Sequence, residues 1–196
     1  MNTVSNIIVY YIIMAEAIKH SSKMLNQTLV FFANLLHTHG IYNWFIGYGT
    51  LLGIVRNNSC IDGDDDVDII IDKKYYQQIM DILSNNNIET WNPVRFGPGF
   101  KHNIIKTFNS DIFASVDFYC ADVNDNWDFH DTWEQLVWSN CHTEKEQFIL
   151  YDWNGTGLNV PHNYETKLIK TYGEDWRTPL SRGNYVSAKT RNIDTL

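Results

Sequence analysis

The chain has 196 residues, of which 44% are apolar and 19% are charged. This length suits one domain with a substantial core, and the apolar content excludes an intrinsically disordered chain. The formal net charge of −8 argues against a protein that binds long nucleic-acid duplexes, because an acidic surface repels their phosphates.

The first apolar stretch, IIVYYIIMAEAI, runs from Ile7 to Ile18. It is too short to span a bilayer, it contains Glu16, and no basic residue precedes it. We therefore expect it to be part of the buried core, and we expect a cytoplasmic protein with no stable membrane span. An uncleaved anchor that directs the chain to the secretory pathway is the alternative.

An amphipathic helix is predicted from Ala15 to His39, and Gly40 is expected to end it. Apolar residues recur in this segment at the spacing of one helical face, at Ile18, Leu25, Leu29, Phe32 and Leu36. The apolar segment NWFIG that follows predicts a short buried strand.

Gly47 and Gly49 then predict a tight turn, and TLLGIVR predicts a helix with Thr50 as its N-cap. The segment VDIIID is rich in β-branched residues and predicts a strand. The order is therefore strand, turn, helix and strand, which places the Gly-Thr pair just before the acidic residues.

The rest of the chain mixes helices and strands without a regular alternation. We expect helices at KKYYQQIMDILSN, DTWEQLVWSN and HNYETKLIKTYG, strands at HNIIKTF and IFASVDFYC, and a hairpin at FILYDWNGTGLNV that turns at Asn154-Gly155. This pattern predicts an α+β fold with a mixed sheet flanked by helices. Cys60, Cys120 and Cys141 are widely spaced and form no C-x-x-C pair, so we expect reduced thiols.

Five of the seven residues from Asp62 to Asp68 are carboxylates. On a strand, Asp66 and Asp68 project to one face, and two such charges about 6 Å apart repel by roughly 3 kcal/mol at an effective dielectric near 20. A hard divalent cation such as Mg²⁺ compensates this repulsion and completes its coordination with water and substrate phosphates. The alternative is a solvated acidic loop without a ligand.

Several motifs can be tested by spacing. An EF-hand that starts at Asp62 or Asp64 lacks the required Gly and Glu. The glycines from Gly47 to Gly53 are one residue too widely spaced for a dinucleotide fingerprint, and no P-loop is present. The short D-x-D pattern of glycosyltransferases that use nucleotide sugars is satisfied.

The order of three features is more specific than any one of them. Gly49 and Thr50 open a helix whose N-terminal N–H groups can hold a phosphate. Asp66 and Asp68 follow on a strand, and Asp117 lies on a later strand within SVDFY. This order resembles the nucleotidyltransferase (polymerase-β-like) fold, in which three carboxylates bind two metal ions around the phosphates of a nucleotide.

The resemblance narrows to one family. The stretch GTLLGIVRNNSCIDGDDDVDI looks like the signature of the LicD/fukutin family, roughly G-T-L-L-G-x-x-R, a short turn and I-P-W-D-x-D-x-D. VPHNYETKLIKTYGEDWRTP resembles the closing motif of the family, with matches at Pro161, Tyr164, Leu168, Tyr172, Gly173, Trp176 and Pro179. We expect one domain over residues 1–196, with an N-terminal extension (1–19), the family match (20–180) and a tail (181–196).

Two departures from the family pattern limit what can be carried over. Asp62 and Gly63 replace the Pro-Trp pair of the family, which adds a charge and removes an aromatic wall, so metal or substrate use is expected to differ. The cysteine zinc site of some fukutin-related members has no counterpart here.

The resemblance implies transfer of a phosphate-linked group, such as phosphocholine or a polyol phosphate, from a CDP-activated donor to a glycan hydroxyl. Its implied cofactor is Mg²⁺ or Mn²⁺, as two ions. The metal ligands would be Asp64, Asp66, Asp68 and Asp117, of which Asp66, Asp68 and Asp117 would be catalytic, with Asp117 also a candidate general base. The substrate-binding residues would be Gly49, Thr50 and Arg56, which would hold the donor phosphate, and Lys106, which would supply charge to the leaving nucleotide.

Several of these roles have alternatives. Gly49 and Thr50 also suit a plain turn and helix cap, Arg56 can pair with the acidic strand instead of with phosphate, and Lys106 can lie on a solvated strand face, like Lys101 and His102. Two other functions remain open: a D-x-D glycosyltransferase, and a glycan-binding module that kept the fold without turnover. Metal bound at the aspartates would separate an enzyme from a binding module.

Overall fold

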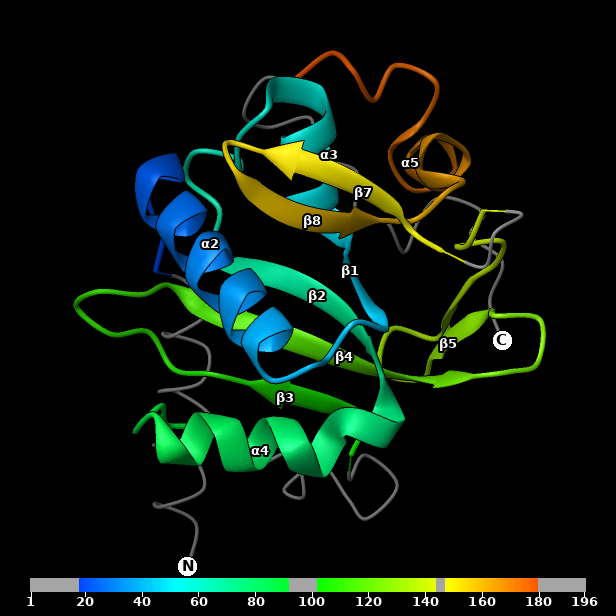
Figure 1. Cartoon of the computed structure of the whole chain (residues 1–196). Helices are drawn as coiled ribbons and strands as arrows, with labels where there is room; N and C mark the ends of the chain where they lie inside the picture. Colours follow the sequence, from blue (N-terminus) through cyan, green and yellow to red (C-terminus); the bar gives the residue numbers. More distant parts are fainter. Residues whose placement is uncertain (1–17, 92–101, 144–146, 180–196) are drawn as a thin grey trace, which may run out of the picture.

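The computed structural model describes residues 18–91, 102–143 and 147–179 (Figure 1). In chain order the elements are α2 (Ser22–Thr38), β1 (Trp44–Ile46), α3 (Tyr48–Asn57), β2 (Asp66–Asp72), the 3₁₀ helix η1 (Lys73–Tyr75), α4 (Tyr76–Asn85), β3 (Ile104–Lys106), β4 (Ser115–Val123), β5 (Phe129–Asp131), β6 (Leu136–Trp138), β7 (Ile149–Trp153), β8 (Thr156–Val160) and α5 (Tyr164–Tyr172). The expected α+β arrangement, a mixed sheet flanked by helices, is confirmed.

The main sheet is built around β2 and β4, which pair in parallel. β1 pairs with β2 on the side away from β4 and runs antiparallel to it. β3 and β5 both pair with β4 and run antiparallel to it. The parallel register places Asp68 directly opposite Asp117, and the antiparallel register places Lys106 opposite Asp117. Sheet pairing therefore brings together three charged residues that are far apart in the sequence.

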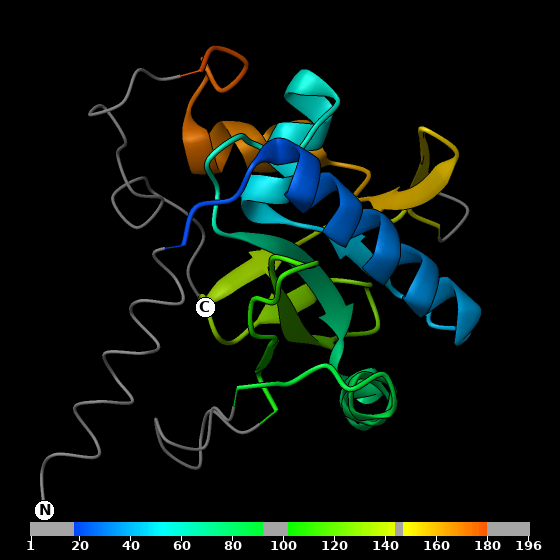
Figure 2. The ribbon, with the colours of Figure 1, turned by 90° about the vertical axis from the view of Figure 1, so that its left-hand side faces the viewer.

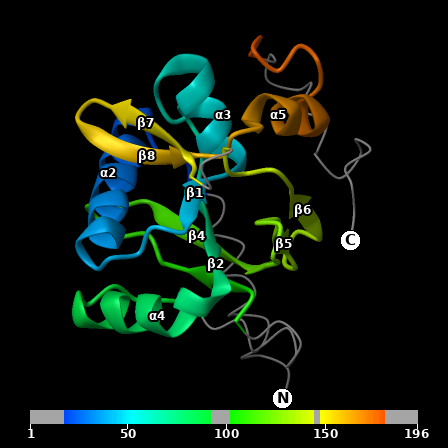
Figure 3. The same cartoon turned by 45° about the vertical axis from the view of Figure 1, so that its right-hand side comes forward.

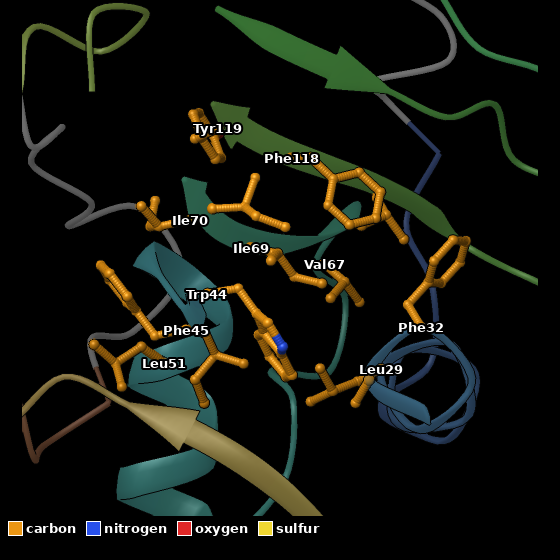
Figure 4. Close-up of a cluster of buried hydrophobic side chains, with 14 of the residues drawn as sticks. Leu29, Phe32, Trp44, Phe45, Leu51, Val67, Ile69, Ile70, Phe118 and Tyr119 are labelled. Atoms are coloured by element: carbon orange, nitrogen blue, oxygen red, sulfur yellow. The ribbon is translucent and has the colours of Figure 1, made fainter. Parts of the chain in front are cut away.

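The core lies where α2 crosses this sheet. In Figures 1 and 2, β2 and β4 lie between α2 and α4. Figure 4 shows Leu29 and Phe32 of α2 directed toward Val67 and Trp44, and all four side chains are at most 1% exposed. Because such side chains have no room to relax, Leu29→Ala is expected to cost about 2–5 kcal/mol.

The β7–β8 hairpin lies against β1 and α2 (Figure 1). Its turn at Asn154 and Gly155 has φ angles of 53° and 83°, as a two-residue type I′ turn requires, so the predicted hairpin is confirmed. The indole Nε1 of Trp153 donates to the carbonyl oxygen of Asn58 at 3.0 Å. This bond ties the hairpin to the C-terminal end of α3.

The segment DTWEQLVWSN is not the helix that its spacing predicts. It contains the end of β5, a turn and β6, which lie below α5 in Figure 3. The carboxylate of Asp131 accepts hydrogen bonds from the backbone N–H groups of Trp133 and Glu134, and Gln135 takes a left-handed φ of 59°. Side-chain capping of the turn thus replaces helical bonding in this segment.

The start of α3 also differs from the prediction. Gly47 is the N-cap, without a side-chain bond, and Thr50 lies within the first turn. The helix N-terminus is instead satisfied by a carboxylate from β2, as described below. A sequence pattern favours a local Thr cap because it cannot show that a distant acceptor is available.

The three cysteines are buried and unpaired, as their spacing predicts. Within the described ranges, no helix is both long enough and apolar enough to cross a membrane. Residues 7–17 of the apolar N-terminal stretch lie outside those ranges, so the expected cytoplasmic location stays a prediction.

Candidate active site

The N-terminus of α3 binds the side chain of Asp68. Its Oδ2 accepts hydrogen bonds from the backbone N–H groups of Gly49 at 3.0 Å and of Thr50 at 3.4 Å. In return, the backbone N–H of Asp68 donates to Oγ1 of Thr50 at 2.8 Å. A carboxylate is favoured at this position because the unsatisfied N–H groups and the helix dipole both attract negative charge. The Gly-Thr pair and the acidic strand are therefore one structural unit.

Asp64, Asp65 and Asp66 form a compact cluster beside this unit, with one oxygen of each within 4.8 Å of the others. The carboxylates of Asp64 and Asp68 both approach Gly49. A Cβ atom added at Gly49 would lie 2.8 Å from Oδ2 of Asp64 and 3.4 Å from Oδ2 of Asp68. The absence of a side chain at Gly49 thus lets two carboxylates approach the same helix turn.

The acidic loop is held from the N-terminal side by residues that precede α2. The backbone N–H of His20 donates to the carbonyl oxygen of Asp64, and the N–H of Gly63 donates to that of His20, both at 2.9 Å. Lys19 also forms an exposed ion pair with Asp65 at 3.2 Å. The position of Asp64 is therefore set by backbone bonds as well as by its side chain.

Asp117 lies in the same region and carries a positive partner. Nζ of Lys106 lies 2.5 Å from Oδ2 of Asp117, and the two side chains are 16% and 3% exposed. Asp68 is the parallel-register neighbour of Asp117 on β2, so Lys106, Asp117 and Asp68 follow one another across three strands. The sequence alone could not place Lys106 in this row, because its register is a property of the sheet.

Burial and mutual repulsion dominate the electrostatics of the site. Burial, and then the charges of Asp68 and Asp117, raise the pKa of Asp66 well above its ordinary value. Burial, and then the charges of Asp117 and Asp64, do the same to the pKa of Asp68. Tyr119 donates its hydroxyl to Oδ1 of Asp68 at 3.3 Å. The site therefore concentrates negative charge that its protein partners compensate only in part.

This set of donors fits a divalent cation. Carboxylate oxygens are the ligands that Mg²⁺ and Mn²⁺ prefer, and a cation would relieve the repulsion that raises these pKa values. The compact cluster contains two of the four predicted ligands, Asp64 and Asp66, together with Asp65, which was not among them. Asp68 adjoins the cluster at Gly49, whereas Asp117 is bound by Lys106.

A buried pair that sequence reasoning missed supports the same turn. The hydroxyl of Tyr48 donates to Oδ2 of Asp131 at 2.5 Å, and burial raises the pKa of Asp131 to about 6. Tyr48 has a left-handed φ of 40°, which is strained for an aromatic residue. Its ring packs against that of Tyr119, with centroids 4.8 Å apart. No sequence signal identifies Asp131, because its partner is 83 residues away.

Other predicted residues lie away from the carboxylates. Arg56 is in the last turn of α3, seven residues and about 10 Å along the axis from Gly49. Its Nη1 donates to the carbonyl oxygen of Trp176 at 3.5 Å. The His102 ring contacts Tyr76 of α4, and Lys101 lies outside the described residues. Trp176 is buried in the core, as expected for a packing residue.

The comparisons with known proteins identify the family. The family model described as "LicD/FKTN/FKRP, nucleotidyltransferase domain" matches residues 41–178. The chain belongs to the LicD/FKTN/FKRP family. The resemblance drawn from the sequence is thereby confirmed, and so is the nucleotidyltransferase fold. Membership of this family makes the protein a transferase related to the nucleotidyltransferases. No curated protein matches the sequence at a significant level.

Three nucleotidyltransferase-like proteins are among the solved structures to which the chain shows some similarity. A lincosamide antibiotic adenylyltransferase, LnuA, with lincomycin bound is 13% identical, with a TM-score of 0.49 over 77% of this chain and 86% of its own. The antibiotic-resistance factor ANT(2'')-Ia is 12% identical, with a TM-score of 0.46 over 69% and 64%. An antigenic nucleotidyltransferase-like protein from Paracoccidioides brasiliensis is 14% identical, with a TM-score of 0.44 over 74% and 63%. At these identities and TM-scores, the three likenesses carry no argument about this chain.

Proposed function

We propose that this LicD/FKTN/FKRP family member is a metal-dependent phosphotransferase. It would move a phosphate-linked group, such as phosphocholine or a polyol phosphate, from a CDP-activated donor to a hydroxyl of a glycan. The observation that carries the proposal is the approach of Asp64 and Asp68 to the N-terminus of α3, with Asp66 clustered beside Asp64 and with Asp117 opposite Asp68 on β4.

In this proposal the cation is held by Asp64, Asp66 and Asp68. A bound Mg²⁺ or Mn²⁺ neutralises the charge of the transferred phosphoryl group. Gly49 and Thr50 act first on Asp68, because their N–H groups bind its carboxylate and Thr50 is only 2% exposed. Whether these two residues also contact the donor phosphate stays a prediction.

Asp117 is the group proposed to accept the proton of the attacking hydroxyl. Lys106 balances the charge of Asp117 and can face the charge that develops on the phosphate. Stabilisation of this developing charge is a main contribution of an enzyme to phosphoryl transfer. The contribution of Arg56 to donor binding, and that of Asp117 to cation binding, stay predictions.

The test is thermal unfolding with Mn²⁺ or Mg²⁺ together with CDP, UDP, GDP or ADP compounds. A ligand present at a hundred times its dissociation constant stabilises the fold by about 2.7 kcal/mol, which is several degrees for this size. We expect stabilisation by a cytidine compound that requires the metal and is lost in Asp66→Asn and Asp68→Asn. The exposed Asp81→Asn is the matched control and should respond like the wild type.

Each variant must be compared with its own baseline, because removing one of several repelling carboxylates is expected to raise the melting temperature without ligand. A shift with UDP or GDP sugars would favour the D-x-D glycosyltransferase. A shift with a glycan alone, and none with any nucleotide and metal, would favour the non-catalytic glycan-binding module.

A further inference from the structure

Lys106 occupies a partly buried position in the row of charges that crosses the sheet. Its main chain is fixed by the antiparallel register of β3 on β4, in which Lys106 faces Asp117 directly. With 16% exposure its side chain is largely covered, unlike that of Lys19, which is 59% exposed where it pairs with Asp65. The Lys106 pair is therefore built into the sheet, whereas the Lys19 pair lies at the surface.

The contacts set Asp117 apart from the compact cluster of the acidic loop. Asp64, Asp65 and Asp66 bring their oxygens within 4.8 Å of one another, and among residues 18–91, 102–143 and 147–179 no cluster of this compactness includes Asp117. Asp117 has an ammonium group at 2.5 Å instead. The Lys106 side chain thus supplies positive charge at Asp117, the one proposed ligand that lies on β4 and not in the acidic loop or on β2.

We propose that Lys106 takes the place of one of the two divalent cations expected for this site, so that the chain binds a single cation on the side of Asp64, Asp66 and Asp68. A second divalent ion at Asp117 would have to displace the partly buried ammonium group of Lys106 or lie beside it, and like charges repel more strongly where access of water is reduced. This inference rests on the proposed function, in which a cation binds to these carboxylates.

The test counts bound ions and needs no substrate. Titration of the full chain with Mn²⁺ alone, followed by calorimetry and by the electron paramagnetic resonance signal of free Mn²⁺, gives the number of sites. We expect one site in the wild type, two in Lys106→Met, which keeps the length of the side chain without its charge, and one in Lys106→Arg.

Two sites in the wild type would overturn the inference, and so would the absence of a gain in Lys106→Met. Asp117→Asn provides a second test if Lys106→Met does not fold. The Asp117→Asn variant should keep the single Mn²⁺ site, and loss of that site would show that Asp117 binds the resident ion. A wild type without any Mn²⁺ site would contradict the metal dependence of the proposed function. The number of Mn²⁺ sites in Lys106→Met would then test separately whether Lys106 takes the place of a cation.

Discussion

Gly49→Ala should separate cation binding from stability, because the nearest atoms to the new methyl group belong to the side-chain carboxylates of Asp64 and Asp68. The added Cβ would lie 2.8 Å from Oδ2 of Asp64. Ordinary contact begins near 3.4 Å, so this carboxylate must retreat by about 0.6 Å, the difference between the two distances. Mg²⁺ tolerates little error in its ligand distances, so the cation would lose much of its bond to Asp64.

The two effects have opposite signs. Gly49 lies in the first turn of α3 with an ordinary backbone conformation, so alanine is expected to stabilise the helix by up to about 1 kcal/mol. Displacing one ligand is expected to weaken Mn²⁺ binding about tenfold or more, which corresponds to about 1.4 kcal/mol. The variant should therefore be at least as stable as the wild type and bind the cation more weakly.

Gly53→Ala, the same change four residues later in the same helix, is the matched control. There the added Cβ would lie 2.7 Å from the backbone oxygen of Ser59 and 3.0 Å from the backbone N of Ile61, which cannot move aside. Overpacking of this kind costs about 1–3 kcal/mol. Urea unfolding and Mn²⁺ titration of both variants check the reasoning, which fails if Gly49→Ala keeps wild-type affinity or loses stability as Gly53→Ala does.

Two further predictions concern the buried partners of this turn. Because burial raises the pKa of Asp131 to about 6, the stability contributed by its protonation is fully present below about pH 4 and is lost as the pH rises through 6. Between pH 7 and pH 5, urea unfolding should show the wild type gaining about 1 kcal/mol relative to Asp131→Asn, and a difference that does not depend on pH would contradict this. Tyr119→Phe removes the hydroxyl that donates to Asp68 and should lower the free energy of unfolding by about 1 kcal/mol, whereas Tyr42→Phe, at a residue 62% exposed, should have almost no effect. Equal stability of the two variants would show that the bond to Asp68 contributes nothing.

The parts of the site that were predictable from sequence are those encoded locally. The β-branched run of β2 determines a strand, and its alternation determines that Asp66 and Asp68 share a face. The hairpin turn at Asn154-Gly155 was predictable for the same reason, because two adjacent residues that tolerate positive φ define it. Neither inference requires knowledge of the rest of the chain.

The parts that were not predictable depend on which partner a charged side chain binds. Trp133, Leu136 and Val137 have helical spacing, but the side chain of Asp131 binds the backbone N–H groups that open the turn. The pairing of Lys106 with Asp117 depends on sheet register, which no local pattern determines. Tertiary contacts therefore decided the outcome wherever a charged side chain found a partner far away in the sequence.

The bond between the Trp153 indole and Asn58 has a consequence for how the protein is made. Asn58 ends α3, and its partner lies 95 residues further along the chain. While the ribosome has yet to extrude the hairpin, the nascent helix lacks this anchor, and β2 lacks its parallel neighbour until β4 has emerged. Contacts of such long range form slowly, so we expect the carboxylates of the candidate site to remain unassembled until late in translation and their repulsion to delay the closure of the nascent sheet.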